Sequence, residues 1–388
     1  MNPVLSSACV TLAGCAVTTQ RNLRTGLALC CTLLGAMALA GCASPPAVAE
    51  EPAQRRGAAG PELAWPTATP AQVGLDGSKL DALVDLIRDT PPADFRALAV
   101  ARHGKLVMNE AFNAFTPSTL HDIRSAGKSV TAMLAGIAAD QGLIDVSASI
   151  VDYFPERRLA PASPLRAIEV RHLLTMSSGL ASDDYDDDSP GTELRMIATA
   201  DYVDFALRLP MAFEPGERYA YSSAVAFLAG AIVENAAGER LEAFARRHLF
   251  NPLGIYELYW QASPSGRTTG MGNLFLTASD LAKLGQVMLD DGRWRGRRVL
   301  SSEWIQASLT SAHDISESDP FAHGYGYLWY LATIGGREVF FASGNGGNKL
   351  FVVPEEKLVV VTLSSAYGQG RGHVRSHNVF ELVLAALD

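Results

Sequence analysis

All five cysteines of this 388-residue chain lie within its first 42 residues. Everything after Cys42 must therefore fold without a disulfide, a thiolate nucleophile or a cysteine-bound metal. A chain of this length can instead form a large hydrophobic core, and 48% of its residues are hydrophobic. That apolar content excludes a largely disordered chain and predicts a globular protein.

Residues 21–42 have the pattern of an export signal. Arg21 and Arg24 precede an apolar run over residues 25–40, and the segment ends in Leu-Ala-Gly-Cys42. This ending resembles the lipobox of bacterial lipoproteins. The resemblance implies a signal peptide over residues 1–42, a lipid on Cys42 and an exported, membrane-anchored protein that faces the periplasm or the cell exterior. The alternative is an uncleaved transmembrane anchor, for which 16 apolar residues are short.

The rest of the chain divides into a predicted tether and one folded domain. Residues 43–64 are rich in Ala, Pro, Gly and Glu without apolar periodicity, which indicates a flexible tether before a domain over residues 65–388. Strand patterns occur at both ends of that domain, and helical spacing dominates about residues 121–270. Strands are predicted at residues 97–101, 106–112, 326–331, 339–342, 350–353 and 358–363, and late helices at 276–289 and 374–387. We therefore expect an α/β (α+β) fold, in which an antiparallel sheet of N- and C-terminal segments is flanked by helices and carries a helical insertion.

Several function classes are disfavoured by the composition and by missing motifs. A formal net charge of −9 argues against nucleic acid as a partner. No H-E-x-x-H zinc motif is present, so no metal is expected, and the absence of a G-x-S-x-G nucleophile elbow argues against an α/β-hydrolase. The segment Gly127-Lys128-Ser129 looks like the end of a phosphate-binding loop, but position 122, where that loop needs glycine, is Asp122.

Ser125 and Lys128 form an S-x-x-K motif at the start of a predicted helix. Residues three apart share one helix face, so the two side chains can touch. A serine hydroxyl needs a base to become a nucleophile, and the positive end of a helix dipole favours the neutral form of a lysine. On the motif alone, the alternative is a helix cap followed by a solvated lysine.

Five ordered sequence blocks carry a resemblance to a known superfamily. The chain resembles the serine β-lactamases and penicillin-binding proteins, in the group that includes class C β-lactamases, related esterases and 6-aminohexanoate-dimer hydrolases. The similarity is closest to the 6-aminohexanoate-dimer hydrolase-like subgroup and implies a β-lactamase/transpeptidase-like fold. The blocks are RSAGKSV at 124–130, VRHLLTMSSGL at 170–180, EPGERYAYSS at 214–223, LFNPLGI at 249–255 and SGNGG at 343–347.

The resemblance implies roles for three catalytic residues. Ser125 would be the acylated nucleophile and Lys128 its proton partner. Tyr221 would act as base for the attack and as acid for the leaving group, with the Lys128 charge lowering its pKa from a usual value near 10. Tyr219 is the competing position and lacks the following Ser-Ser. The backbone N–H groups of Ser125 and Asn345 would form the oxyanion hole.

The other implied elements bind the substrate, and two of them depart from the β-lactamase pattern. The segment Ala342-Ser343-Gly344 stands where relatives have K-T-G or H-T-G, so the usual cation is missing. Ser223 stands where β-lactamases have Asn. Both departures argue against β-lactamase and transpeptidase activity, whereas 6-aminohexanoate-dimer hydrolases share them.

Two aromatic residues and an acidic loop complete the predicted site. By resemblance, Tyr185 closes over the substrate and Trp329 lines the pocket, although an aromatic residue in a strand usually belongs to the core. Residues 182–189 carry five aspartates around Tyr185. They are either a solvated loop or a feature that favours substrates with a free amine.

Together these features predict a lipid-anchored serine hydrolase. It would cleave a small-molecule ester or linear amide through a Ser125 acyl-enzyme, without a cofactor. One alternative is a β-lactamase or D-amino-acid carboxypeptidase that acts on cell-wall peptides. Another is a ligand-binding lipoprotein that keeps the fold but lacks catalytic activity.

Overall fold

A computed structural model describes residues 65–387 of the chain. The predicted signal peptide, the lipidation site Cys42 and the tether over residues 43–64 therefore lie outside the described residues. In the described part, no helix combines the length and the apolar character that a membrane span requires.

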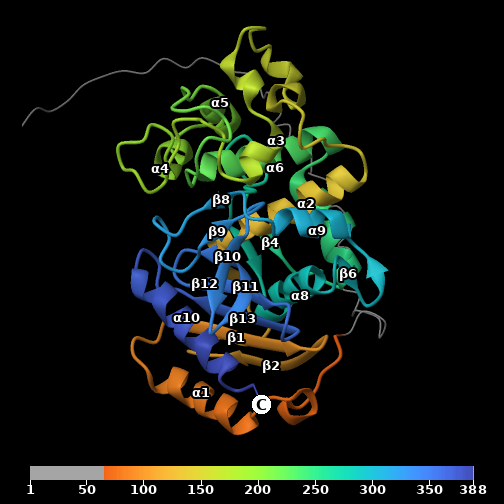
Figure 1. The fold of residues 1–388 in the computed structure, drawn as a ribbon, viewed down its shortest axis with the longest axis vertical. Coiled ribbons are helices and arrows are strands. Elements are labelled where there is room, and N and C mark those ends of the chain that lie inside the picture. The colour runs from red at the N-terminus through yellow and green to blue at the C-terminus, as the bar shows by residue number, and fades with distance from the viewer. Residues whose placement is uncertain (1–64, 388) are drawn as a thin grey trace, which may run out of the picture. The chain divides into compact units, whose positions relative to one another are not determined.

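One eight-stranded antiparallel sheet joins the two ends of the described chain (Figure 1). The strand over residues 95–102 pairs with the last strand, residues 358–364, on one side and with the strand over residues 105–111 on the other, which confirms the predicted sheet of N- and C-terminal segments. In the order β2-β1-β13-β12-β11-β10-β9-β8, the strands are Lys105–Ala111, Phe95–Arg102, Leu358–Ser364, Asn348–Val353, Arg337–Gly344, Tyr330–Ile334, Gly324–Tyr325 and His313–Asp314.

Helices cover both faces of this sheet. The helices α1 (Gly77–Asp89) and α10 (Gly370–Leu384) pack together on one face, and α8 (Ala278–Leu289) lies on the other. The absence of a side chain at Gly285 lets α8 approach closely, because a Cβ there would lie 2.7 Å from a Leu350 methyl group. Strands β12 and β13 are buried along their whole length, which explains their almost uninterrupted apolar sequences.

The segment between β2 and β8 is mainly helical (Figure 1). Its α-helices are α2 (Gly127–Asp140), α3 (Val170–Leu174), α4 (Glu193–Ile197), α5 (Tyr202–Leu207), α6 (Ser223–Ala237), α7 (Leu241–Ala245) and, after α8, α9 (Ser302–Ser308). Helices α2 and α6 pack against each other and are buried almost all round, so their sequences lack a polar face.

Short elements connect these parts. The 3₁₀-helices are η1 (Pro70–Val73), η2 (Arg124–Ala126), η3 (Ile150–Tyr153), η4 (Pro155–Arg157), η5 (Pro164–Ala167) and η7 (Asn251–Leu253), and η6 (Arg246–Phe250) is a π-helical continuation of α7. The strands β3 (His121–Asp122), β5 (Leu274–Leu276) and β4 (Tyr259–Trp260) form a small sheet, and β6 (Arg293–Trp294) pairs with β7 (Arg297–Arg298).

The strand prediction for residues 326–331 was wrong in its first part. Strand β10 begins only at Tyr330, because the chain turns sharply before it. Gly326 lies so close to α9 that a Cβ would meet the Ser308 carbonyl oxygen at 2.1 Å, and Leu328 has a φ of 57°. This turn directs Trp329 into the hydrophobic core.

Candidate active site

Ser125 lies in the tight turn η2 at the start of α2, and glycine backbones approach that turn from two sides. A Cβ on Gly344, at the end of β11, would lie 2.1 Å from the Ile123 carbonyl oxygen. On the other side, a Cβ on Gly272 would lie 3.0 Å from the Arg124 carbonyl oxygen. Arg124 itself has a φ of 53°, which bends the chain into the turn. The glycines therefore allow the sheet to contact the segment that presents Ser125.

This close approach makes Gly344→Ala a specific prediction. We expect the new methyl group to displace the Ser125 turn, to lower the free energy of unfolding by about 1–3 kcal/mol and to reduce ester hydrolysis by about 10–100-fold. The measurements are thermal unfolding and turnover of a p-nitrophenyl ester. Gly370→Ala is the matched control, because a Cβ there meets nothing within 4 Å. Equal behaviour of the two variants would contradict the expected displacement.

Lys128 touches Ser125 as the S-x-x-K spacing predicts. Its Nζ lies 3.0 Å from Ser125 Oγ, 3.2 Å from Ser223 Oγ and 2.8 Å from the Met271 carbonyl oxygen. The side chain is buried, and burial lowers the pKa of Lys128 while Glu193 and Asp184 act in the opposite direction. Desolvation, and not the helix dipole alone, thus favours the neutral amine.

Tyr221 lies beside this pair, just before α6. Ser222 caps that helix by accepting a hydrogen bond from the backbone N–H of Val225, which places its two neighbours, Tyr221 and Ser223, at the site. The Ser125 side chain is a polar neighbour of the Tyr221 hydroxyl that acts to lower its pKa, and Lys128 Nζ lies 5.0 Å from the centre of the Tyr221 ring.

The protonation state of Tyr221 differs from the expectation. We expected the Lys128 charge to lower its pKa. Instead, burial raises the pKa of Tyr221, and the carboxylates of Asp184 and Glu193 add to the rise. The resting Tyr221 side chain is therefore the protonated phenol, which can donate a proton to a leaving group.

Tyr185 lies over Tyr221, where the acidic loop meets the site. The two rings are stacked with their centres 5.2 Å apart, and 69% of Tyr185 is exposed. Tyr219, the competing position, instead packs against Tyr325. A cavity of about 560 Å³ opens beside these tyrosines, and it is lined by Asp183, Tyr185, Arg218, Tyr219, Ala220, Tyr221, Asp314, Ile315, Ser316, Glu317 and Ser318.

The predicted substrate-binding segment Ala342-Ser343-Gly344 lies at the end of β11, and a glycine-rich turn follows it. Ser343 is half-buried on β11, and Asn345 directly follows the close contact made by Gly344. The Asn345 peptide is fixed, since its carbonyl oxygen accepts a bond from Asn348 Nδ2 and its Oδ1 accepts one from the Gly368 N–H. These bonds hold Asn345 in place, and its backbone N–H stays a predicted donor of the oxyanion hole.

Ala342 stands where relatives have a cation, and Lys349 on the neighbouring strand does not replace that cation. Lys349 pairs across from Ser343, but its Nζ lies 4.6 Å from the centre of the Phe341 ring, in a buried position. Burial lowers the pKa of Lys349 to about 7, although Asp319 counteracts the shift. The side chain belongs to the interior next to α10, where it influences the pKa of His377.

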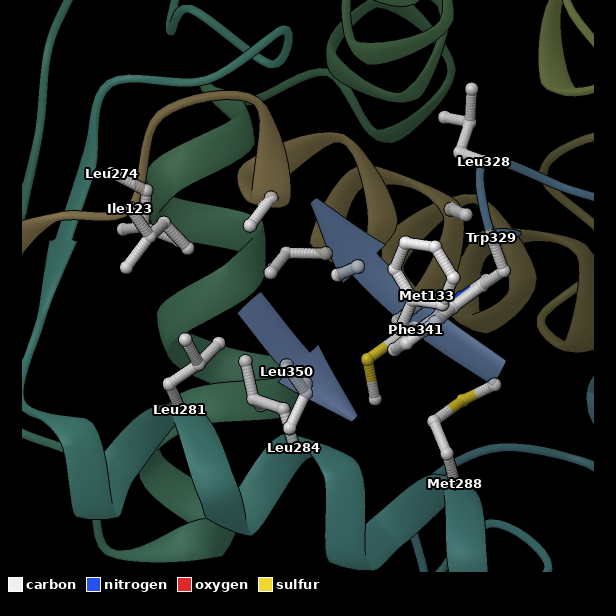
Figure 2. Packing of buried hydrophobic residues seen from close by; sticks show 14 of the residues in the cluster. Ile123, Met133, Leu274, Leu281, Leu284, Met288, Leu328, Trp329, Phe341 and Leu350 are labelled. Carbon is white, nitrogen blue, oxygen red and sulfur yellow. The ribbon is translucent and has the colours of Figure 1, made fainter. Parts of the chain in front are cut away.

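Trp329 is a correction to the predicted substrate pocket. It is 1% exposed, packs edge-on against Phe340 and lies within the buried hydrophobic cluster in Figure 2. Its position follows from the turn before β10, which could not be recognised from an apparent strand pattern.

Two acidic residues near Lys128, Asp184 and Glu193, were not identified as site residues from the sequence. Asp184 accepts hydrogen bonds from the backbone N–H groups of Ser223 and Glu193, both at 2.7 Å, and Glu193 Oε2 accepts one from Ser223 Oγ at 3.3 Å. Asp184 lies within the five-aspartate run, where its neighbours conceal its separate role. Glu193 had no sequence signal that linked it to Lys128.

The family comparison agrees with this arrangement. A model of the β-lactamase family matches residues 96–384, which is well over half of the chain. The chain belongs to the β-lactamase family. The enzyme is thus a serine hydrolase related to β-lactamases and penicillin-binding proteins.

Individual relatives show the range of this family. The chain is 28% identical over 326 residues to the 6-aminohexanoate-dimer hydrolase of Paenarthrobacter ureafaciens, covering 77% of this chain and 80% of the relative. It is 25% identical over 286 residues to penicillin-binding protein 4 of Amycolatopsis lactamdurans, covering 65% and 74%. The octameric penicillin-binding protein homologue from Pyrococcus abyssi shares the fold, with a TM-score of 0.64, 22% identity and coverage of 80% and 78%.

Proposed function

We propose that this β-lactamase-family enzyme hydrolyses a small ester or linear amide through an acyl-enzyme on Ser125. The observation that carries the proposal is the 3.0 Å contact between Ser125 Oγ and Lys128 Nζ, a buried amine with a lowered pKa. A neutral amine at hydrogen-bond distance is the base that a serine nucleophile needs.

The protonation states of the site give a proton route. Ser125 Oγ attacks the acyl carbon and passes its proton to Lys128, while the phenol of Tyr221 donates a proton to the leaving group. Lys128 then returns a proton to Tyr221, so that both residues regain their resting states. In deacylation, water attacks the acyl-enzyme, and one of its protons is delivered to the departing Ser125 oxygen.

The cavity favours linear substrates with an amine over β-lactams. Three acidic residues, Asp183, Asp314 and Glu317, line it against one cation, Arg218, and carboxylates next to the aromatic face of Tyr185 suit an ammonium group. A β-lactam carries a carboxylate instead, and Ala342 supplies no cation for it. The similarity to a 6-aminohexanoate-dimer hydrolase also supports a linear amide.

Covalent labelling tests the nucleophile. The soluble chain from residue 43 is treated with a fluorophosphonate, and the label is located by peptide mass spectrometry. We expect one label, on Ser125, and faster turnover of an amine-bearing p-nitroanilide than of its N-acetylated form. A folded protein that stays unlabelled would contradict the acyl-enzyme, whereas equal turnover of both p-nitroanilides would contradict only the amine preference.

A second candidate activity is hydrolysis of β-lactams or D-amino-acid peptides. It is favoured by the similarity to penicillin-binding protein 4 of Amycolatopsis lactamdurans. Hydrolysis of a chromogenic cephalosporin that disappears in Ser125→Ala would support this activity over the linear-amide proposal.

We further infer that the mature chain is exported and held at a membrane by a lipid on Cys42. The support is the basic, apolar and Leu-Ala-Gly-Cys pattern of residues 21–42. The full chain expressed in a Gram-negative host should enter the detergent phase of a phase-separation experiment. Cys42→Ser should abolish this partitioning, and an unchanged distribution would overturn the inference.

A further inference from the structure

We propose that Glu193 is a positioning residue that acts through the Ser223 hydroxyl and aims the proton-accepting position of Lys128 at Ser125. This inference rests on the proposed acyl-enzyme function and adds a fourth member to its proton network. The chain of contacts runs from Ser125 Oγ to Lys128 Nζ at 3.0 Å, to Ser223 Oγ at 3.2 Å and to Glu193 Oε2 at 3.3 Å.

The direction of each hydrogen bond follows from the chemistry of the groups. The Met271 carbonyl oxygen is 2.8 Å from Lys128 Nζ and can only accept, so one N–H is committed to it. The Glu193 Oε2 atom accepts, so Ser223 donates its single proton to Glu193. Ser223 Oγ can then only accept from Lys128, which commits a second N–H.

The remaining position on Lys128 Nζ faces Ser125. In the ammonium form it carries the third N–H, and in the neutral amine it carries the lone pair. Proton exchange at Lys128 is thereby confined to the position that faces the nucleophile. Without the carboxylate, the Ser223 hydroxyl could donate to the amine, and the lone pair could turn away from Ser125.

Asp184 holds Ser223 and Glu193, the last two members of this chain of contacts, next to each other. Its two carboxylate oxygens accept from the backbone N–H groups of Ser223 and Glu193, and its own N–H donates to the Tyr221 carbonyl oxygen at 2.8 Å. The groups that act electrostatically on Lys128 are Glu193, Asp184 and Tyr185, with the Tyr221 ring packed beside it. Glu193 has the largest electrostatic influence among them and favours the charged form of Lys128.

Two variants separate the hydrogen bond from the charge. Glu193→Gln removes a charge that raises the pKa of Lys128, so this pKa falls further and the neutral base persists to lower pH. We expect the ascending limb of kcat/KM against pH to move down by about half to one pH unit. The plateau should fall about tenfold, because the Gln amide can also donate to Ser223 Oγ and so leave the Ser223 proton free to turn towards Lys128. Glu193→Asp keeps the charge but is one methylene shorter, so it loses the hydrogen bond from Ser223. In this variant the plateau of kcat/KM should fall, while the ascending limb of the pH profile stays in place.

A double-mutant cycle tests whether Glu193 acts through Ser223. Ser223→Ala should lower the plateau about tenfold, and adding Glu193→Gln should lower it little further, because the hydroxyl that transmits the effect is already absent. Asp204→Asn is the control, since Asp204 pairs with Arg208 at the surface of α5. Two results would overturn the role of Glu193. One is a plateau of kcat/KM in the double variant that falls by the product of the two single losses, and the other is an unchanged ascending limb in Glu193→Gln.

Titration of Lys128 itself keeps this test independent of turnover. The Lys128 Cε resonance of carbon-13-labelled protein is assigned by its absence from Lys128→Arg and followed against pH. Glu193→Gln should move its midpoint to lower pH, and an unchanged midpoint would overturn the electrostatic part of the proposal. If Ser125→Ala hydrolyses ester as fast as the wild type does, the acyl-enzyme function fails, whereas the resonance still decides the role of Glu193.

Discussion

Ser125→Ala is expected to lower kcat/KM for a p-nitrophenyl ester by at least about 1000-fold. The variant loses the attacking oxygen, and removal of the nucleophile from a serine hydrolase leaves only the catalysis that substrate binding and the oxyanion hole provide. Small Ser→Ala changes seldom unfold a protein, so thermal unfolding should remain close to that of the wild type. Steady-state turnover, read by absorbance, provides the measurement.

A serine four residues further along the chain, on α2, supplies the control. Ser129 is buried one turn along α2 and donates its hydroxyl hydrogen bond to the Leu328 carbonyl oxygen at 2.6 Å. Ser129→Ala should lose stability through that bond but keep ester turnover within a few fold. Substantial turnover by a folded, fluorophosphonate-resistant Ser125→Ala would show that another residue is the nucleophile.

Tyr221→Phe should have the second largest effect, and its size should depend on the leaving group. The phenol that donates the leaving-group proton is lost, and general acid catalysis contributes about 100- to 10,000-fold. An amine leaving group needs that proton, so amide hydrolysis should fall by about 1000-fold. A p-nitrophenolate leaves without protonation, so ester hydrolysis should fall by only about tenfold.

Tyr219→Phe is the matched control for this leaving-group effect. Tyr219 packs against Tyr325 and lines the same cavity, whereas Tyr221 has Ser125 among the polar neighbours that influence its pKa. Tyr219→Phe should therefore affect ester and amide hydrolysis to a similar, small extent. An equal loss of ester and amide turnover in Tyr221→Phe would contradict its role as the acid.

Local patterns predicted most of the elements. The hairpin of β1 and β2, the helix α2 and the last two strands occur where hydrophobic periodicity placed them. The segment over residues 326–331 failed, because a strand pattern does not reveal the contact of Gly326 with the Ser308 carbonyl oxygen. That contact joins residues from different elements, and it decides that Trp329 lies in the core.

The candidate site also has features that the sequence predicts and features that depend on the tertiary structure. The sequence by itself determined the contact between Ser125 and Lys128, because helix geometry brings together residues three apart. The tertiary structure decided the protonation of Lys128 and Tyr221, because desolvation depends on everything packed around a group. It also decided the place of Glu193, which reaches Ser223 only because Asp184 binds both backbones. Burial and hydrogen bonds between distant segments form only when the chain folds, so no local pattern encodes them.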